Sequence, residues 1–382
     1  MGVIDKPSKQ AWDGRAWVEV DLAALEHNAA LLRSIMSPCC KLMAVVKADA
    51  YGHGAQRVAE RLQNEGVNAF AVATAGEGVK LRESGILGEI VILGYTGKKD
   101  ATFLNEFRLT QLVIDGAHAK ALDETGLDVG VHIAIDTGMH REGIQASDIA
   151  EIESVFKCRH LAVEGLATHL ASSDSLDPGD VRFTEKQIER FFSTADVLKG
   201  KGYDVGKLHI QASYGLLNYG NINCDYVRAG IALYGVMSHD EGTRTKLDLK
   251  PALALRAVVA QVRWIGAGES VSYGRTFTAD RPLKLATVCI GYADGVPRHM
   301  SGNNGFCLIR GQKAPILGRI CMDLLLADVT EIENVEPSDV ATMIGRDGGE
   351  EIRCEDFARA AGTISNEILC RLGSRLPRIY IG

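Results

Sequence analysis

A lysine that follows a run of apolar residues offers the most reactive chemistry in the sequence. Residues 41–47, KLMAVVK, read as a buried strand that ends on Lys47, and Tyr51, Gly52 and Gly54 lie in the turn after it. Burial lowers the pKa of a lysine, and a neutral amine can form a Schiff base with an aldehyde. Glycines let backbone N–H groups approach an anion closely. The stretch therefore favours pyridoxal phosphate, which carries both an aldehyde and a phosphate, over a lysine that merely extends to solvent.

Charged and hydroxyl-bearing residues also occur where other predicted strands end. They are Asp136, Arg141, His169, Ser213 and Arg228. A barrel enzyme builds its site from the carboxyl ends of its strands, so we expect these side chains on one rim. A rim rich in cations and hydroxyls suits an anionic ligand such as a phosphate. Taken singly, each arginine is better explained by a salt bridge, and His169 by a structural role.

Short apolar runs alternate with amphipathic helix candidates, such as residues 55–66 and 180–202, over the first part of the chain. Near-continuous apolar strands are buried on both faces, as in parallel sheets. Their alternation with helices over about 200 residues predicts a (β/α)8 barrel, in a domain of residues 14–246. The predicted strands span residues 41–47, 69–75, 89–95, 109–115, 131–136, 162–169, 207–213 and 226–235.

The pattern changes after Asp248. Strand-like segments separated by Gly, Pro and Asp turns predict a mostly β domain over residues 247–382. Near the other end of the chain, an alternating strand at about residues 15–20 is expected to pair with this β domain. Residues 21–34 read as a capped helix of the barrel. The predicted fold class is α/β, a TIM barrel followed by a mostly β C-terminal domain.

Composition narrows the functional class. The chain has 382 residues, 46% hydrophobic residues and a net charge of −7, which does not favour nucleic acid as a partner. No apolar run approaches the roughly 20 residues of a membrane helix, and no secretory signal is evident, so we expect a cytoplasmic protein. The 9 cysteines are scattered without a C-x-x-C pair, which indicates reduced thiols and no metal site.

Several motifs resemble the alanine racemase family, whose members are barrel enzymes that use pyridoxal phosphate. AVVKADAYGHG (44–54) resembles the family's cofactor-lysine signature, and VSYGRTF (271–277) and GRICMD (318–323) are specific in combination. The resemblance covers nearly the whole chain. The other matching segments are DTGMHREG (136–143), ATHLASSD (167–174), YVRAGIALYG (226–235) and IGYADGVPR (290–298).

The resemblance implies a role for each matching residue. Lys47 would hold the cofactor covalently and act as one base, and Tyr273 would be the second base. Arg228 would face the pyridine nitrogen, with His169 between it and Tyr273, and Arg141 would face the phenolic oxygen. The implied cofactor-binding residues are Lys47, Tyr51, Arg141, His169, Ser213, Arg228, Gly230, Ile231 and Asn366, and the implied substrate-binding residues are Arg141, Tyr292, Met322, Asp323 and Asn366.

The resemblance also implies a head-to-tail homodimer, in which Tyr273, Met322 and Asp323 reach the site of the other subunit. Racemisation itself favours two acid/base groups on opposite faces of a planar intermediate. Lysine and tyrosine both start with a pKa of about 10, so each needs help to act as a base. Arg228 and His169 could supply that help for Tyr273 electrostatically. An arginine at the ring nitrogen should also limit transamination.

The sequence departs from the commonest family pattern at Ala134, His140, Ala212 and Asn366. Ala134 replaces a carbamylated lysine that supports the arginine corresponding to Arg141 in many members. Asn366 replaces a tyrosine near the phosphate and the substrate side chain. This change resembles the racemase domain of the vancomycin-resistance serine racemases, which carry a membrane domain. A carboxamide frees volume and can form a hydrogen bond with the hydroxymethyl group of serine.

The predicted function is a pyridoxal-phosphate-dependent racemase of L- and D-serine, alanine or both, which supplies D-amino acids for peptidoglycan precursors. The chain is either a free-standing enzyme or the cytoplasmic domain of a membrane-anchored protein. A plain alanine racemase is the first alternative. An amino-acid decarboxylase on the same plan would need its own catalytic residues in the β domain. A non-catalytic pyridoxal-phosphate-binding protein would resemble the barrel alone.

Overall fold

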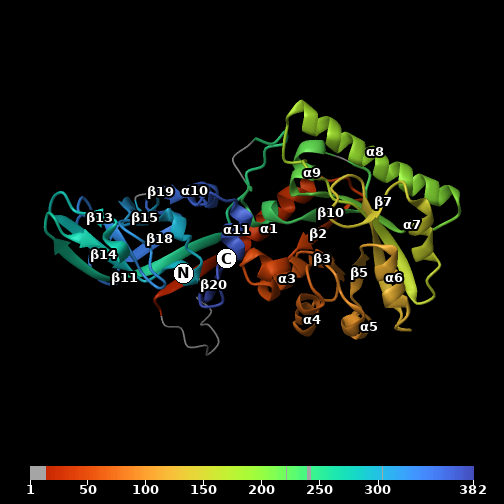
Figure 1. Cartoon of the computed structure of the whole chain (residues 1–382), viewed down its shortest axis with the longest axis horizontal. Helices are drawn as coiled ribbons and strands as arrows, with labels where there is room; N and C mark the ends of the chain where they lie inside the picture. The colour runs from red at the N-terminus through yellow and green to blue at the C-terminus, as the bar shows by residue number, and fades with distance from the viewer. Residues whose placement is uncertain (1–13, 221, 239–241, 303) are drawn as a thin grey trace.

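The computed structural model of the chain describes residues 14–220, 222–238, 242–302 and 304–382. Two parts lie side by side along the long axis of the molecule (Figure 1). One is a barrel of parallel strands with helices around it, and the other is rich in antiparallel strands. The predicted fold class, a TIM barrel followed by a mostly β C-terminal domain, is therefore confirmed.

The barrel closes through pairing of its first and last strands. Parallel neighbours follow the order β5-β4-β3-β2-β10-β9-β8-β6, and β5 pairs with β6. A short strand, β7 (Ile144–Gln145), adds to β6. The barrel strands are β2 (Lys41–Val45), β3 (Ala69–Val72), β4 (Glu89–Ile92), β5 (Thr110–Val113), β6 (Val129–Asp136), β8 (Leu161–Ala167), β9 (Lys207–Ala212) and β10 (Tyr226–Ala229).

The helices around the barrel begin at polar caps that the sequence provides. Asp21 accepts a hydrogen bond from the backbone N–H of Ala24 and starts α1, and Thr74 forms a capping box with Glu77 at α4. No helix in the described part of the chain is long and apolar enough to cross a membrane. The helices are α1 (Leu22–Ser34), α3 (Ala55–Asn64), α4 (Ala75–Glu83), α5 (Ala101–Glu106), α6 (Gly116–Asp123), α7 (Ile149–Phe156), α8 (Pro178–Gly200) and α9 (Ser213–Tyr219).

The second part contains both ends of the described chain. The first strand, β1, pairs antiparallel with β11 and parallel with β20. Helices α10 (Cys354–Ala360) and α11 (Ser365–Cys370) connect this part back to the barrel (Figure 1). Its strands are β1 (Ala16–Asp21), β11 (Leu253–Ile265), β12 (Ser270–Val271), β13 (Phe277–Thr278), β14 (Leu283–Val288), β15 (Phe306–Ile309), β16 (Gln312–Pro315), β17 (Leu325–Asp328), β18 (Val340–Asp347), β19 (Glu350–Ile352) and β20 (Arg378–Ile381).

The barrel strands end earlier than the sequence predicted, and the difference places the functional residues. Strand β2 stops at Val45, and Lys47 opens the next turn, α2 (Lys47–Tyr51), instead of closing the strand. The predicted strand 226–235 breaks at Gly230, and a 3-10 turn follows at Ile231–Tyr234. Apolar composition does not distinguish the buried turn at Ile231–Tyr234 from the strand before it, because both lie in the core.

Candidate active site

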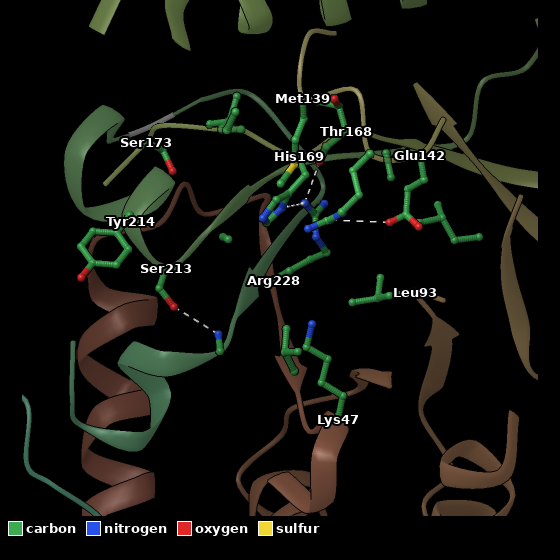
Figure 2. Close-up of a pocket in the computed structure, with 18 of the residues that line it drawn as sticks. Lys47, Leu93, Met139, Glu142, Thr168, His169, Ser173, Ser213, Tyr214 and Arg228 are labelled. Carbon is green, nitrogen blue, oxygen red and sulfur yellow. Dashed lines mark hydrogen bonds and ion pairs between the residues drawn. The ribbon is translucent and has the colours of Figure 1, made fainter. Parts of the chain in front are cut away.

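A cavity of about 500 Å³ opens at the carboxyl ends of the barrel strands. Figure 2 shows Lys47, His169, Ser213 and Arg228 converging on it from different strands. Asn366 reaches the same cavity from α11, in the second part of the chain. The residues that the resemblance assigned to the cofactor all line it, namely Lys47, Tyr51, Arg141, His169, Ser213, Arg228, Gly230, Ile231 and Asn366.

A left-handed turn brings Lys47 and Tyr51 into this cavity. The φ angles of Ala48, Asp49, Ala50 and Tyr51 are all between 52° and 55°. L-residues rarely adopt this conformation, and it costs roughly 1–2 kcal/mol per residue. Two carboxylates hold the turn: Glu77 accepts from the Ala48 N–H at 2.8 Å, and Asp49 accepts from the Ala55 N–H at 2.8 Å. Such strain persists only where the surroundings enforce it, and it is typical of functional sites.

The environment of the Lys47 amine disfavours its charged form. Burial lowers its pKa, and the nearby Arg141 guanidinium lowers it further. Figure 2 shows the amine pointing into the cavity toward Arg228. A neutral amine in this position can attack an aldehyde or accept a proton.

The other end of the cavity forms an anion cradle. Ser213 Oγ accepts hydrogen bonds from the N–H groups of Gly230 and Ala232, at 3.1 and 3.3 Å, which leaves its own proton free to donate to a ligand. Burial raises the pKa of Tyr51 to about 12, so the phenol stays a donor. A Cβ atom at position 230 would lie 2.7 Å from the Tyr51 oxygen, so a larger residue there would displace the Tyr51 hydroxyl.

Arg228 is buried beside this cradle and is held by neutral acceptors. Its Nη2 donates to the Thr168 carbonyl at 2.7 Å and to His169 Nδ1 at 3.2 Å. Burial first, and then the positive charges of Arg228 and Arg141, lower the pKa of His169 to about 3. His169 is therefore a neutral imidazole whose Nε2 carries the proton.

Arg141 has a carboxylate partner that the sequence analysis missed. Its Nη2 lies 3.6 Å from Oε1 of Glu142, an ion pair at the cavity wall (Figure 2). Ala134 also lines the cavity and offers no polar side-chain atom. No sequence signal identified Glu142, because a charged residue after an arginine is common on any surface.

Asn366 is fixed by two further residues that sequence reasoning missed. Its Oδ1 accepts a hydrogen bond from Ser238 Oγ at 2.7 Å, and the Ser238 N–H donates to the Tyr214 hydroxyl at 3.0 Å. All three residues line the cavity. Because the carbonyl oxygen of Asn366 is occupied, its amide N–H groups are the ones available to a ligand.

The remaining predicted site residues are not in this cavity. Tyr273, Tyr292 and Met322 lie in the β-rich part with 69%, 43% and 52% of their surface exposed. Asp323 pairs with Arg375 at 2.7 Å. Strand β13, four residues after Tyr273, lies far from the barrel strands in Figure 1. Within one chain, therefore, Lys47 and Tyr273 are not brought together.

The backbone around Tyr273 is strained. Ser272 has φ 64° and Arg275 has φ 51°, with Gly274 at φ 70° between them. The Ser272 hydroxyl donates to the Arg319 carbonyl at 2.5 Å, and the Tyr292 N–H donates to the Cys321 carbonyl at 3.0 Å. These bonds join three loops that carry exposed apolar side chains. Strain and an exposed apolar surface together indicate a contact site.

The cavity fits pyridoxal phosphate. The desolvated Lys47 amine matches the aldehyde, the cradle at Ser213 and Gly230 matches the phosphate, and Arg228 and Arg141 match the ring nitrogen and phenolic oxygen. The lack of a side chain at Gly230 leaves room for the Tyr51 hydroxyl beside this backbone, so the two proposed phosphate donors lie together.

Comparisons with known proteins match this description. Residues 20–238 match the family model for the N-terminal domain of alanine racemase, and residues 252–380 match the model for its C-terminal domain. An amino-acid racemase of Enterococcus faecalis is 46% identical, and a serine/alanine racemase of Enterococcus gallinarum is 41% identical, each over 95% of this chain. The chain spans 51% of either relative, about half of their length.

The fold is also similar to that of a solved alanine racemase. Alanine racemase from Bacillus anthracis with bound L-Ala-P superposes with a TM-score of 0.92 at 31% identity. The alignment covers 98% of this chain and 96% of that chain. Both the barrel and the β-rich part are therefore shared with it.

Proposed function

Because the chain belongs to the alanine racemase family, we propose that it is a racemase that interconverts the L and D forms of alanine and serine with pyridoxal phosphate. The family depends on this cofactor. The observation that carries the proposal is the convergence of a desolvated lysine, two arginines and a phosphate-sized cradle on one cavity.

Different residues of the cavity would contact different parts of the cofactor. Lys47 would hold it through the amine, and Tyr51, Ser213 and the backbone of Gly230 and Ile231 would hold the phosphate. Arg228 would face the pyridine nitrogen. When bound, pyridoxal phosphate withdraws electrons from the substrate and makes its α-proton acidic.

The proton transfers belong to two side chains. Lys47, whose pKa is lowered by burial and by Arg141, takes or returns the α-proton on one face of the substrate. Tyr273 of a second copy of the chain does the same on the other face. Arg141 binds the substrate carboxylate and keeps the α-carbon between the two groups. In the assembled site, the positive charge of Arg228 and the N–H group of neutral His169 would assist proton transfer at the Tyr273 hydroxyl.

A homodimer supplies the missing Tyr273. Tyr273, Tyr292, Met322 and Leu324 are exposed on loops of the β-rich part that hydrogen bonds join together. An exposed apolar surface of this kind marks an interaction site. The occupant is the barrel mouth of a second copy, because these loops carry Tyr273, the second base that the resemblance implies, and Tyr273 lies outside the barrel cavity of its own chain.

Serine turnover is proposed from Asn366. With Oδ1 taken by Ser238, the amide of Asn366 presents N–H donors to the cavity, and a serine hydroxyl can accept from them. The methyl group of alanine needs no partner, so alanine remains a substrate. The D-amino acids would serve as precursors of peptidoglycan, and the reaction would take place in the cytoplasm.

The proposal is tested by measuring D-alanine from L-Ala and D-serine from L-Ser, with wild type and with Tyr273→Phe. Wild type should produce both D-amino acids. Tyr273→Phe should retain bound cofactor and lose racemisation by about 10²- to 10⁴-fold. If wild type binds pyridoxal phosphate and interconverts neither amino acid, the racemase proposal fails; D-alanine without D-serine leaves a plain alanine racemase.

A further inference from the structure

A column of buried polar side chains runs down the inside of the barrel from Arg228. Arg228 Nη1 lies 2.8 Å from His209 Nδ1, and His209 Nε2 lies 2.9 Å from His132 Nδ1. His132 Nε2 then faces Glu89 Oε1 at 3.4 Å. Both histidines have no exposed surface, and Arg228 is 5% exposed. The column joins the cavity to the opposite end of the barrel, where strand β4 begins at Glu89.

Arg228 fixes the direction of both hydrogen bonds in the column, the one from Arg228 to His209 and the one between the two histidines. A guanidinium only donates, so His209 Nδ1 must accept and its proton must sit on Nε2. His209 Nε2–H then donates to His132 Nδ1, which places the proton of His132 on Nε2 as well. Burial first, and then the positive charge of Arg228, keep the pKa of His209 well below its usual value, so it stays neutral. The proton on His132 Nε2 therefore lies near the Glu89 carboxylate, 3.4 Å from its Oε1, although neither of these two buried atoms forms a hydrogen bond in the described structure.

Glu89 is the negative end of the column. Its Oε2 accepts hydrogen bonds from Lys207 Nζ and from the Tyr226 hydroxyl, both at 2.6 Å. Burial opposes ionisation of Glu89, but these two hydrogen bonds and the charge of Lys207 lower its pKa overall. An ionised carboxylate with two strong donors on one oxygen leaves the other oxygen to orient His132.

We propose that Glu89, His132 and His209 are positioning residues for Arg228, and that the carboxylate at the base of the barrel holds both imidazoles in one tautomer and so fixes the guanidinium at the cavity. This proposal rests on the proposed function, in which Arg228 faces the cofactor ring. The remaining acceptors that the described structure gives Arg228 are backbone carbonyls and His169, so the column links it to a counter-charge without placing a carboxylate beside the ring nitrogen.

A metal site is the competing interpretation of some of the same residues. Ligand atoms of Glu89, His132 and Glu164 lie within 4.8 Å of one another and could hold a metal ion. A metal needs the lone pair of His132 Nε2, but the direction of donation from Arg228 places a proton on that nitrogen. A positioning column and a metal site therefore make opposite predictions for one atom.

The direct test is nitrogen NMR of the holoenzyme with ¹⁵N-labelled histidine, with His132→Gln and His209→Gln used to assign the signals. Both residues should be neutral Nε2–H tautomers that do not titrate between about pH 5 and pH 9. Addition of Zn²⁺ should shift neither signal. A proton on Nδ1 of either residue, or a zinc-dependent shift of His132, overturns the column. This readout does not depend on racemisation, so it can fail while the proposed function stands.

Substitutions give a second readout. Glu89→Gln should lower kcat for racemisation about tenfold with little change in KM, and should alter the visible absorption spectrum of the bound cofactor. Glu164→Gln is the matched control, because it removes a carboxylate from the same end of the barrel but outside the column. This substitution should change neither kcat nor the absorption spectrum of the bound cofactor. Equal effects of the two substitutions would contradict the proposal.

The histidine in the middle of the column allows a rescue experiment. His209→Gln keeps one acceptor toward Arg228 and one donor toward His132, whereas His209→Leu keeps neither. The glutamine variant should therefore retain the wild-type absorption spectrum and a kcat at least about fivefold above that of the leucine variant. A leucine variant that folds and keeps the wild-type spectrum would overturn the proposal.

Discussion

The two halves of the proposed site differ in how they are assembled. In the barrel half, Arg228 and the cradle at Ser213 are buried and form hydrogen bonds within one chain, and Lys47 lines the same cavity. The β-rich half, with Tyr273 and Met322, is exposed on strained loops. One chain therefore brings together the residues proposed to bind the cofactor, whereas in our proposal Tyr273 acts only when a second copy brings it to the cavity.

The difference follows from the chemistry that each half performs. A lysine nucleophile needs desolvation to lower its pKa, and a phosphate cradle needs fixed donors, so both require a rigid interior. The second base lies on the opposite face of the substrate from the lysine. The substrate must therefore be able to enter the space between the two groups. If that base comes from another subunit, as we propose, the cavity of each chain stays open until the two copies meet.

The largest expected effect lies in the barrel half. Lys47→Ala removes both the covalent attachment and one base, so racemisation should fall by at least about 10³-fold. The visible absorption of the lysine-bound cofactor should disappear, while circular dichroism should show an unchanged fold. Retention of that absorption in the variant would show that another residue holds the cofactor.

Acid should destabilise the barrel half. Burial lowers the pKa of His53 to about 4, from 6.5 in the unfolded chain. The unfolded state then binds more protons, so stability is complete above pH 6.5 and falls as the pH drops toward 4, by about 3 kcal/mol for this residue alone. His132, with a pKa lowered to about 4 mainly by burial, adds to the same loss.

Urea unfolding at several pH values measures this effect. The free energy of unfolding should decline below pH 6.5, and hydrogen exchange should rise first in the barrel strands. His53→Gln should reduce the pH slope, even where it lowers stability at neutral pH. An unchanged slope in His53→Gln would mean that His53 is not the buried neutral group described above.

A charge placed on the exposed loops of the β-rich part should weaken the dimer, whereas a charge on the outer surface of the barrel should not. Met322→Glu places a carboxylate in the proposed contact and should weaken the dimer about tenfold, with activity that recovers at high protein concentration. Leu87→Glu is the control, because Leu87 is 86% exposed on the barrel outside the proposed contact. Analytical ultracentrifugation compares the two; equal dimer affinities would argue against this surface.

The smallest expected effect concerns substrate choice at the boundary of the two parts. Asn366→Tyr removes the amide donors held by Ser238 and fills the space beside the substrate side chain. The ratio of kcat/KM for serine to that for alanine should fall roughly fivefold. Ser238→Ala frees the amide and should lower the ratio less. A ratio that neither change alters would remove the argument for serine.

The barrel was predictable from the sequence because near-continuous apolar strands and intervening amphipathic helices constrain the fold strongly. The rule that barrel sites lie at the carboxyl ends of strands then located Lys47, His169 and Ser213 together. The family resemblance added Asn366, which local sequence pattern alone could not connect to a barrel cavity. Its helix follows the barrel by more than a hundred residues.

The remaining features depend on tertiary geometry. The left-handed turn from Ala48 to Tyr51 contains no glycine, so composition gave no sign of it. Ser238 and Glu142 are ordinary polar residues until the fold places them beside Asn366 and Arg141. The buried column from Arg228 to Glu89 uses histidines in strands that otherwise read as apolar core.

Subunit mixing tests the division of the site between two copies most directly. Lys47→Ala and Tyr273→Phe should each be nearly inactive alone. When both are co-expressed, half of the dimers are mixed and each mixed dimer has one intact site, so about a quarter of wild-type activity should return. If the mixture stays as inactive as the separate variants, Lys47 and Tyr273 do not act across a subunit interface, and the account is contradicted.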